Sequence, residues 1–163
     1  MRIMVLNHTS LREYDAATAR RLDIELNKYA SEGTTLERHY PDDLGGVGAL
    51  HHLRKGKALA GLHHILETPA LVKKIIEAER LGFDAVVQSN TFDPGIEAAR
   101  MAVRIPVVGP LRSSCHFAAS LCDRFAFIVP LDSYVPYVAR LVETYRMGHF
   151  VTGIKALNMY EPG

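Results

Sequence analysis

Asp84-Ala-Val-Val-Gln-Ser-Asn-Thr-Phe-Asp-Pro-Gly-Ile-Glu-Ala-Ala-Arg100 is the stretch that decides the fold. An apolar strand over Asp84–Val87 runs into four polar residues, and an Asp-Pro-Gly turn then leads into a helix over Ile96–Val103. The four polar residues are Gln88, Ser89, Asn90 and Thr91. A parallel strand that delivers hydrogen-bonding side chains to a helix N-terminus forms half of an anion-binding cleft. The stretch therefore predicts a ligand cleft at the carboxyl ends of parallel strands.

Short apolar strands alternate with amphipathic helices along the rest of the chain. Further strands are predicted at Met1–Leu6, Thr34–His39, Pro106–Val108, Phe125–Val129 and Val151–Leu157. Further helices are predicted at Tyr14–Ala30, Ala70–Leu81, Ser114–Cys122 and Tyr134–Tyr145. For the helix at Ala70–Leu81, Thr68 is predicted as the N-cap and Pro69 as the first helical position. This order predicts an α/β fold of parallel sheets flanked by helices. Two similar Rossmann-like lobes, residues 1–104 and 105–163, would share the cleft.

Composition limits the class of protein. The chain has 163 residues, of which 48% are hydrophobic, and its 19 basic side chains nearly balance 18 acidic ones. This balance provides no broad positive field for nucleic acid or an anionic membrane, and no apolar run approaches the ~20 residues of a membrane span. Cys115 and Cys122 lie two helical turns apart, roughly 10 Å, which is too far for a disulfide. We predict a cytoplasmic protein with reduced thiols.

The sequence also resembles a known family. Together with Arg104-Ile-Pro-Val-Val-Gly-Pro110, the 84–100 stretch is similar to the aspartate/glutamate/hydantoin racemase superfamily, in particular its hydantoin and allantoin racemase branch. The similarity continues in Cys115-His116-Phe117-Ala118, in Arg124–Val129 and in Arg2–Asn7 with Thr9-Ser10. It implies cofactor-independent proton transfer beside the carbonyl of a small carboxylate, amino acid or cyclic ureide.

The chain departs from the pattern of that branch at its catalytic positions. A cysteine normally ends the central strand, and matching the Asp-Pro-Gly turns places Asn90 there. The second catalytic cysteine is expected in a strand beyond Gly163, and Pro130 replaces a threonine pair. A two-cysteine mechanism is therefore not assigned, and a single base suits a lyase, decarboxylase or one-sided tautomerase better than a racemase. Without those later elements one sheet edge is expected to be unpaired, which predicts a homo-oligomer.

Asn7 and His8 follow the first strand, at the predicted cleft. The resemblance implies that Asn7 anchors a substrate carboxylate. His8 is a candidate general acid or base, since an unperturbed imidazole has a pKa of about 6.5. Ser89, Asn90 and Thr91 are predicted to bind the substrate and to stabilise an enolate oxygen. The alternative is that all of them only satisfy amides of loops and helix ends.

Ser113, Ser114 and Cys115 are predicted at the start of a helix. The two serines are candidate substrate-binding residues. A helix N-terminus lowers the pKa of a thiol, so Cys115 is the second candidate proton carrier. The alternative is a small core residue, the usual role of a cysteine in an alanine-rich helix.

A histidine-rich segment allows a metal site to be considered. His51, His52, His63, His64 and Glu67 are ligand types that suit zinc or iron. Neighbouring helical side chains point about 100° apart, and no His-Glu-x-x-His pattern is present. We predict no metal and no cofactor. A metal-dependent hydrolase and a non-catalytic ligand-binding protein remain the alternatives.

Overall fold

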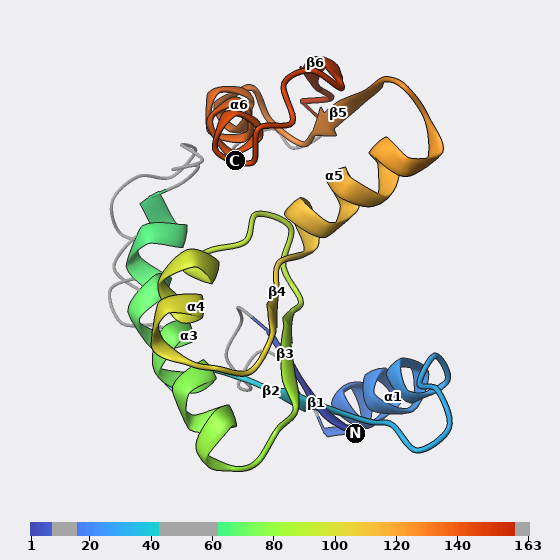
Figure 1. The fold of residues 1–163 in the computed structure, drawn as a ribbon, viewed down its shortest axis with the longest axis vertical. Helices are drawn as coiled ribbons and strands as arrows, with labels where there is room; N and C mark the ends of the chain where they lie inside the picture. The colour runs from blue at the N-terminus through green and yellow to red at the C-terminus, as the bar shows by residue number, and fades with distance from the viewer. Residues whose placement is uncertain (8–15, 43–61, 159–163) are drawn as a thin grey trace.

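The computed structural model describes residues 1–7, 16–42 and 62–158 (Figure 1). Its elements are β1 (Arg2–Leu6), α1 (Ala16–Asn27), β2 (Thr35–His39), α3 (Leu62–Arg80), β3 (Ala85–Gln88), α4 (Ile96–Ala102), β4 (Val107–Val108), α5 (Pro110–Leu121), β5 (Phe125–Val129), a 3-10 turn η2 (Asp132–Tyr134), α6 (Val135–Thr144) and β6 (Val151–Ala156). They form a four-stranded sheet of order β2-β1-β3-β4 and a two-stranded sheet of β5 and β6. Every pairing is parallel, so the predicted α/β fold is confirmed.

The four-stranded sheet buries one face beneath two helices. Met4, Leu6 and Val86 alternate with residues of the opposite face and are fully buried, as the period of two along a strand requires. Leu71 and Ile75 of α3 pack against them in the same cluster. Figure 1 shows α3 and α4 on this side of the sheet and α1 on the other.

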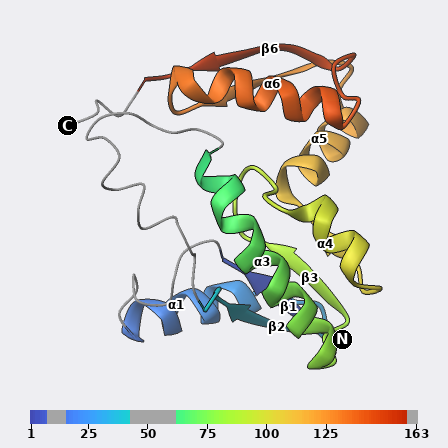
Figure 2. The same cartoon turned by 90° about the vertical axis from the view of Figure 1, so that its left-hand side faces the viewer.

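The two-stranded sheet has a core of its own beneath α6. Val138 and Val142 lie one helical turn apart on α6, and both are buried in a cluster that includes Val129 at the end of β5. Figure 2 shows α6 along β6, with α5 leading up to this layer from the first sheet. Within the described ranges, no helix combines the length and apolar character that crossing a membrane requires.

The helix predicted at Ala70–Leu81 is longer than its sequence signals indicate. It begins at Leu62, so Pro69 lies inside it, and the predicted N-cap and first-turn roles of Thr68 and Pro69 are wrong. The Thr68 hydroxyl instead donates to the His64 carbonyl, one turn back, at 2.7 Å. Burial of His64 and Glu67 in the added turns shows that tertiary packing extends the helix past a residue that normally interrupts one.

The helix predicted at Ser114–Cys122 also starts earlier. It runs from Pro110 to Leu121, so Ser113 and Ser114 lie inside the helix rather than at its start. The short strand β4, which the predicted boundary at 104 assigns to the second lobe, pairs with β3 in the first sheet. The division into two domains stays a prediction.

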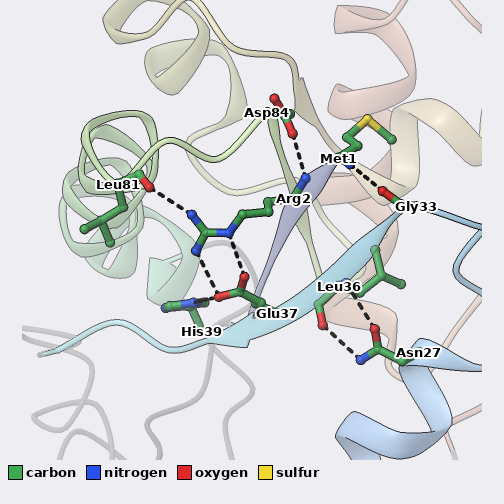
Figure 3. A network of polar contacts seen from close by, with 9 residues as sticks. All are labelled: Met1, Arg2, Asn27, Gly33, Leu36, Glu37, His39, Leu81 and Asp84. Carbon is green, nitrogen blue, oxygen red and sulfur yellow. Dashed lines mark hydrogen bonds and ion pairs between the residues drawn. The ribbon is translucent and has the colours of Figure 1, made fainter.

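A polar network ties the strands together at the amino end of the sheet (Figure 3). The Arg2 guanidinium donates to Glu37 at 2.9 Å and to the Leu81 carbonyl at 3.1 Å, and it lies 4.4 Å from the centroid of the Phe83 ring. The backbone N–H of Arg2 donates to Asp84 at 2.6 Å. The hydrogen bond from Arg2 lowers the pKa of Glu37. These groups lie where β1 and β3 begin, at the end of the sheet opposite the predicted cleft.

Candidate functional site

The carboxyl ends of β1 and β3 place polar side chains next to each other. Leu6 pairs with Gln88, the last residue of β3, so Asn7 follows β1 where the polar residues 89–91 follow β3. The backbone N–H of Asn7 donates to the His39 carbonyl at 2.9 Å, and only 7% of the residue is exposed. Its side-chain Nδ2 is buried and has no hydrogen-bond partner among the described residues. Buried polar groups in proteins are nearly always hydrogen-bonded, so this amide nitrogen is expected to donate to an acceptor.

Asn90 holds the turn that follows β3. Its Oδ1 accepts hydrogen bonds from the backbone N–H groups of Phe92 at 3.2 Å and Asp93 at 3.1 Å, which is an Asx-type turn. Its Nδ2 donates to Gln88 Oε1 at 3.3 Å, and Gln88 in turn donates to the Pro94 carbonyl at 2.7 Å. The Asn90 oxygen therefore supports the backbone, and only the amide nitrogen can donate to a ligand.

Asp93 connects this turn to the second layer of the molecule. Its two carboxylate oxygens accept from the backbone N–H groups of Leu111 at 2.9 Å and Arg112 at 2.8 Å, in the first turn of α5. The Tyr145 hydroxyl donates to the same carboxylate at 2.8 Å. An anion at a helix N-terminus accepts hydrogen bonds from amides that lack partners within the helix, and its charge interacts favourably with the helix dipole. A residue distant in sequence thus performs the capping that starts α5 at Pro110.

A buried histidine–glutamate pair lies beside the same turn. His64 Nδ1 and Glu67 Oε1 are 2.6 Å apart, and the two residues are only 5% and 1% exposed. The His64 ring stacks on Tyr137 of α6, with centroids 5.5 Å apart, and packs against Phe92 at 5.4 Å. The i, i+3 spacing places the pair on one helix face. That spacing was the available signal, but the sequence interpretation considered these residues only as metal ligands.

Two tyrosines face the pair from the second layer. Burial, together with the charges of Glu67 and Asp93, raises the pKa of Tyr137 to about 12. Burial and the charge of Glu67 also raise the pKa of Tyr134, whose ring stacks on Phe92 at 5.0 Å. Both phenols are therefore protonated at neutral pH.

The other predicted site residues are brought together only in part. Ser89 and Thr91 are exposed on either side of Asn90, and Ser113 and Ser114 are exposed on α5. Their substrate-binding roles stay predictions. His8 lies outside the described residues, as do His51 and His52. Among the residues that are described, no three His, Cys, Asp or Glu side chains are grouped to hold a metal ion.

Cys115 is a core residue in the structure. It is 1% exposed and packs in the cluster with Leu111 and Val138. Burial and the nearby charge of Asp93 raise the pKa of its thiol, the opposite of the lowering predicted for a helix N-terminus. Because α5 starts at Pro110, Cys115 lies in the second turn, away from the terminal amides. A protonated thiol is a weak base, and its role as a proton carrier stays a prediction.

The two thiols should differ in alkylation. We expect iodoacetamide at neutral pH to modify Cys122, which is exposed, and to leave Cys115 unmodified until the protein is unfolded in urea. Both thiols are free, and a raised pKa lowers the thiolate fraction that reacts. Peptide mass spectrometry over a time course measures the two rates. Equal modification of both cysteines in folded protein would show that Cys115 is accessible.

Comparisons with known proteins agree on one family. A model of the Asp/Glu/Hydantoin racemase family matches residues 60–162. Hydantoin racemase from Rhizobium meliloti is 28% identical over 99 residues, which are 61% of this chain and 41% of that protein. Hydantoin racemase from Pseudomonas sp. (strain NS671) is 34% identical over 94 residues, 58% of this chain and 38% of that protein. The chain thus matches about two fifths of the length of each of these relatives.

Two solved structures have a similar fold. Allantoin racemase from Klebsiella pneumoniae superposes with a TM-score of 0.75 at 21% identity, covering 96% of this chain and 58% of that one. Allantoin racemase from Pseudomonas fluorescens gives the same TM-score and identity, with coverage of 98% and 62%.

Proposed function

The chain belongs to the Asp/Glu/Hydantoin racemase family, and from that premise we propose that it catalyses cofactor-independent proton transfer at a carbon beside a carbonyl. The proposed substrates are small carboxylates, amino acids or hydantoin-type ureides. The observation that carries the proposal is the buried Nδ2 of Asn7, which has no partner among the described residues. Leaving such a donor unsatisfied costs about 1–3 kcal/mol, which an acceptor oxygen of a ligand would remove.

The donors at the carboxyl edge suit a developing enolate. Removing the proton from carbon places negative charge on the carbonyl oxygen, and each oriented donor lowers the barrier by ~3 kcal/mol. Asn7 is the first such donor in the proposal. The further donors are the Asn90 amide nitrogen and the exposed hydroxyls of Ser89 and Thr91, which follow the neighbouring strand β3. Asn90 itself cannot remove the proton, because an amide is not basic.

Proton–deuterium exchange at the α-carbon tests the proposal. We expect NMR in D₂O to detect exchange in at least one member of a panel of chiral hydantoins, allantoin and acidic amino acids. Asn7→Ala should lower the rate by about 100-fold, the usual effect of losing one oxyanion donor. Asn27→Ala is the matched control, since Asn27 bonds the backbone of Leu36 near the amino-end network. Its rate should equal that of the wild type.

A ligand-binding protein without catalysis is the second candidate. The hydrogen bonds of the Asn90 side chain within the turn favour this second candidate. Asn90 occupies the position of a cysteine in the hydantoin and allantoin racemase branch, and here that position stabilises the backbone. Calorimetric binding of a panel member without any exchange in folded wild-type protein would decide for this candidate and against proton transfer.

A further inference from the structure

The buried pair on α3 has the geometry of an acid–base dyad. The 2.6 Å contact between His64 Nδ1 and Glu67 Oε1 fixes the ring orientation, and proton exchange at this imidazole then occurs at Nε2. A carboxylate bonded to Nδ1 also stabilises the imidazolium that forms when Nε2 takes a proton. Buried ionisable groups of this kind are costly to maintain and are frequent at functional sites.

The dyad lies at the same end of the sheet as the donors. α3 leads through a short connection into β3 and packs against it, so the start of the helix lies at the carboxyl end of the strand. The His64 ring packs on Phe92, whose N–H bonds Asn90. One turn further along, the Thr68 methyl lies within 3.0 Å of where a side chain at Gly95 would begin. The dyad therefore borders the turn that carries Ser89–Thr91.

We propose that His64 is a proton carrier of this site and that Glu67 is its positioning residue, an inference that rests on the proposed function. The C–H bond beside the carbonyl breaks and its proton passes to His64 Nε2. The C–H electron pair forms the carbon–carbon double bond of the enolate, while the carbonyl π pair moves onto the oxygen. Return of a proton to carbon restores the carbonyl and the neutral imidazole. Phe92 and Tyr137 pack on the His64 ring, with their own ring centroids 5.7 Å apart, so in this proposal the two rings separate to admit the ligand to Nε2.

The exchange measurement extends directly to the dyad. His64→Gln should lower the exchange rate at least 100-fold while ligand affinity stays within a few-fold, because general acid–base groups contribute rate rather than binding. Glu67→Gln should also lower the rate, by up to about 10⁴-fold, because it removes the carboxylate that orients the imidazole and stabilises the imidazolium. His149→Gln, at an exposed position, is the matched control and should behave like the wild type.

A second readout requires no variant of the dyad. In protein labelled with ¹⁵N-histidine, adding a panel ligand that binds should shift the Nε2 resonance of His64 and leave that of His149 unchanged. Retained exchange in a folded His64→Gln variant, or an unshifted His64 resonance with ligand bound, overturns the role of His64 and leaves the proposed function intact. Wild-type protein that exchanges no panel member overturns both. A His64→Gln variant that fails to fold makes Glu67→Gln and the resonance shift decisive.

Discussion

Asp93→Ala is expected to lower the free energy of unfolding by about 4 kcal/mol, because each buried donor left without its acceptor costs about 1–3 kcal/mol. The carboxylate accepts three hydrogen bonds, from the backbone of Leu111 and Arg112 and from the hydroxyl of Tyr145. All three donors lose their partner in the variant. The φ of 53° at Asp93 adds to the loss, since alanine tolerates the left-handed region less well than aspartate.

Urea denaturation followed by circular dichroism measures this effect. Asp84→Ala is the matched control: Asp84 also accepts a backbone N–H, that of Arg2 at 2.6 Å, but it is exposed, so we expect a loss under about 1 kcal/mol. Tyr145→Phe removes one of the three bonds to Asp93 and should lie between the two. Equal losses for the two aspartate variants would mean that capping of α5 from the turn contributes little.

The sequence predicts the sheets better than it predicts the helix starts. Strands such as Phe125–Val129 were found at their expected bounds, because short apolar runs between turns need only local information. The starts of α3 and α5 depend on long-range contacts instead. The buried pair His64–Glu67 is stacked against α6, and the amides that begin α5 bind Asp93, so no signal near either start reveals them.

In the candidate site, too, some features can be predicted from the sequence and others depend on long-range contacts. The position of Asn7 beside the polar stretch after β3 follows from parallel pairing, which the apolar strand pattern predicts. The Asn90 side-chain oxygen accepts hydrogen bonds within the turn only because residues 90–93 adopt this conformation. The acid–base interpretation of His64 needs Phe92 and Tyr137 around the ring, and these come from other parts of the chain. Pairing within a sheet is thus readable from sequence, whereas contacts between layers are not.

Gly109→Ala is expected to lower the free energy of unfolding by about 3 kcal/mol, at the upper end of the usual range for forcing extra atoms into a packed interior. A Cβ at this position would lie 2.5 Å from Asp93 Cγ and 2.7 Å from both carboxylate oxygens. The backbone itself is not the obstacle, since φ is −97° and ψ is 128°, a conformation that alanine adopts readily. The loss would come entirely from the clash with a carboxylate whose three hydrogen bonds keep it from moving aside.

A double-mutant cycle separates that clash from other effects of the methyl group. In the Asp93→Ala background, the carboxylate is absent and the added Cβ has room, so Gly109→Ala should cost less than about 1 kcal/mol there. The coupling between the two sites should then be about 2 kcal/mol, within the range for residues in contact. Gly148→Ala controls for the substitution itself, because a Cβ there meets nothing within 4 Å. Additive losses at Gly109 and Asp93 would contradict the close approach of the 93 turn to α5, on which the alignment of the two layers around the candidate site depends.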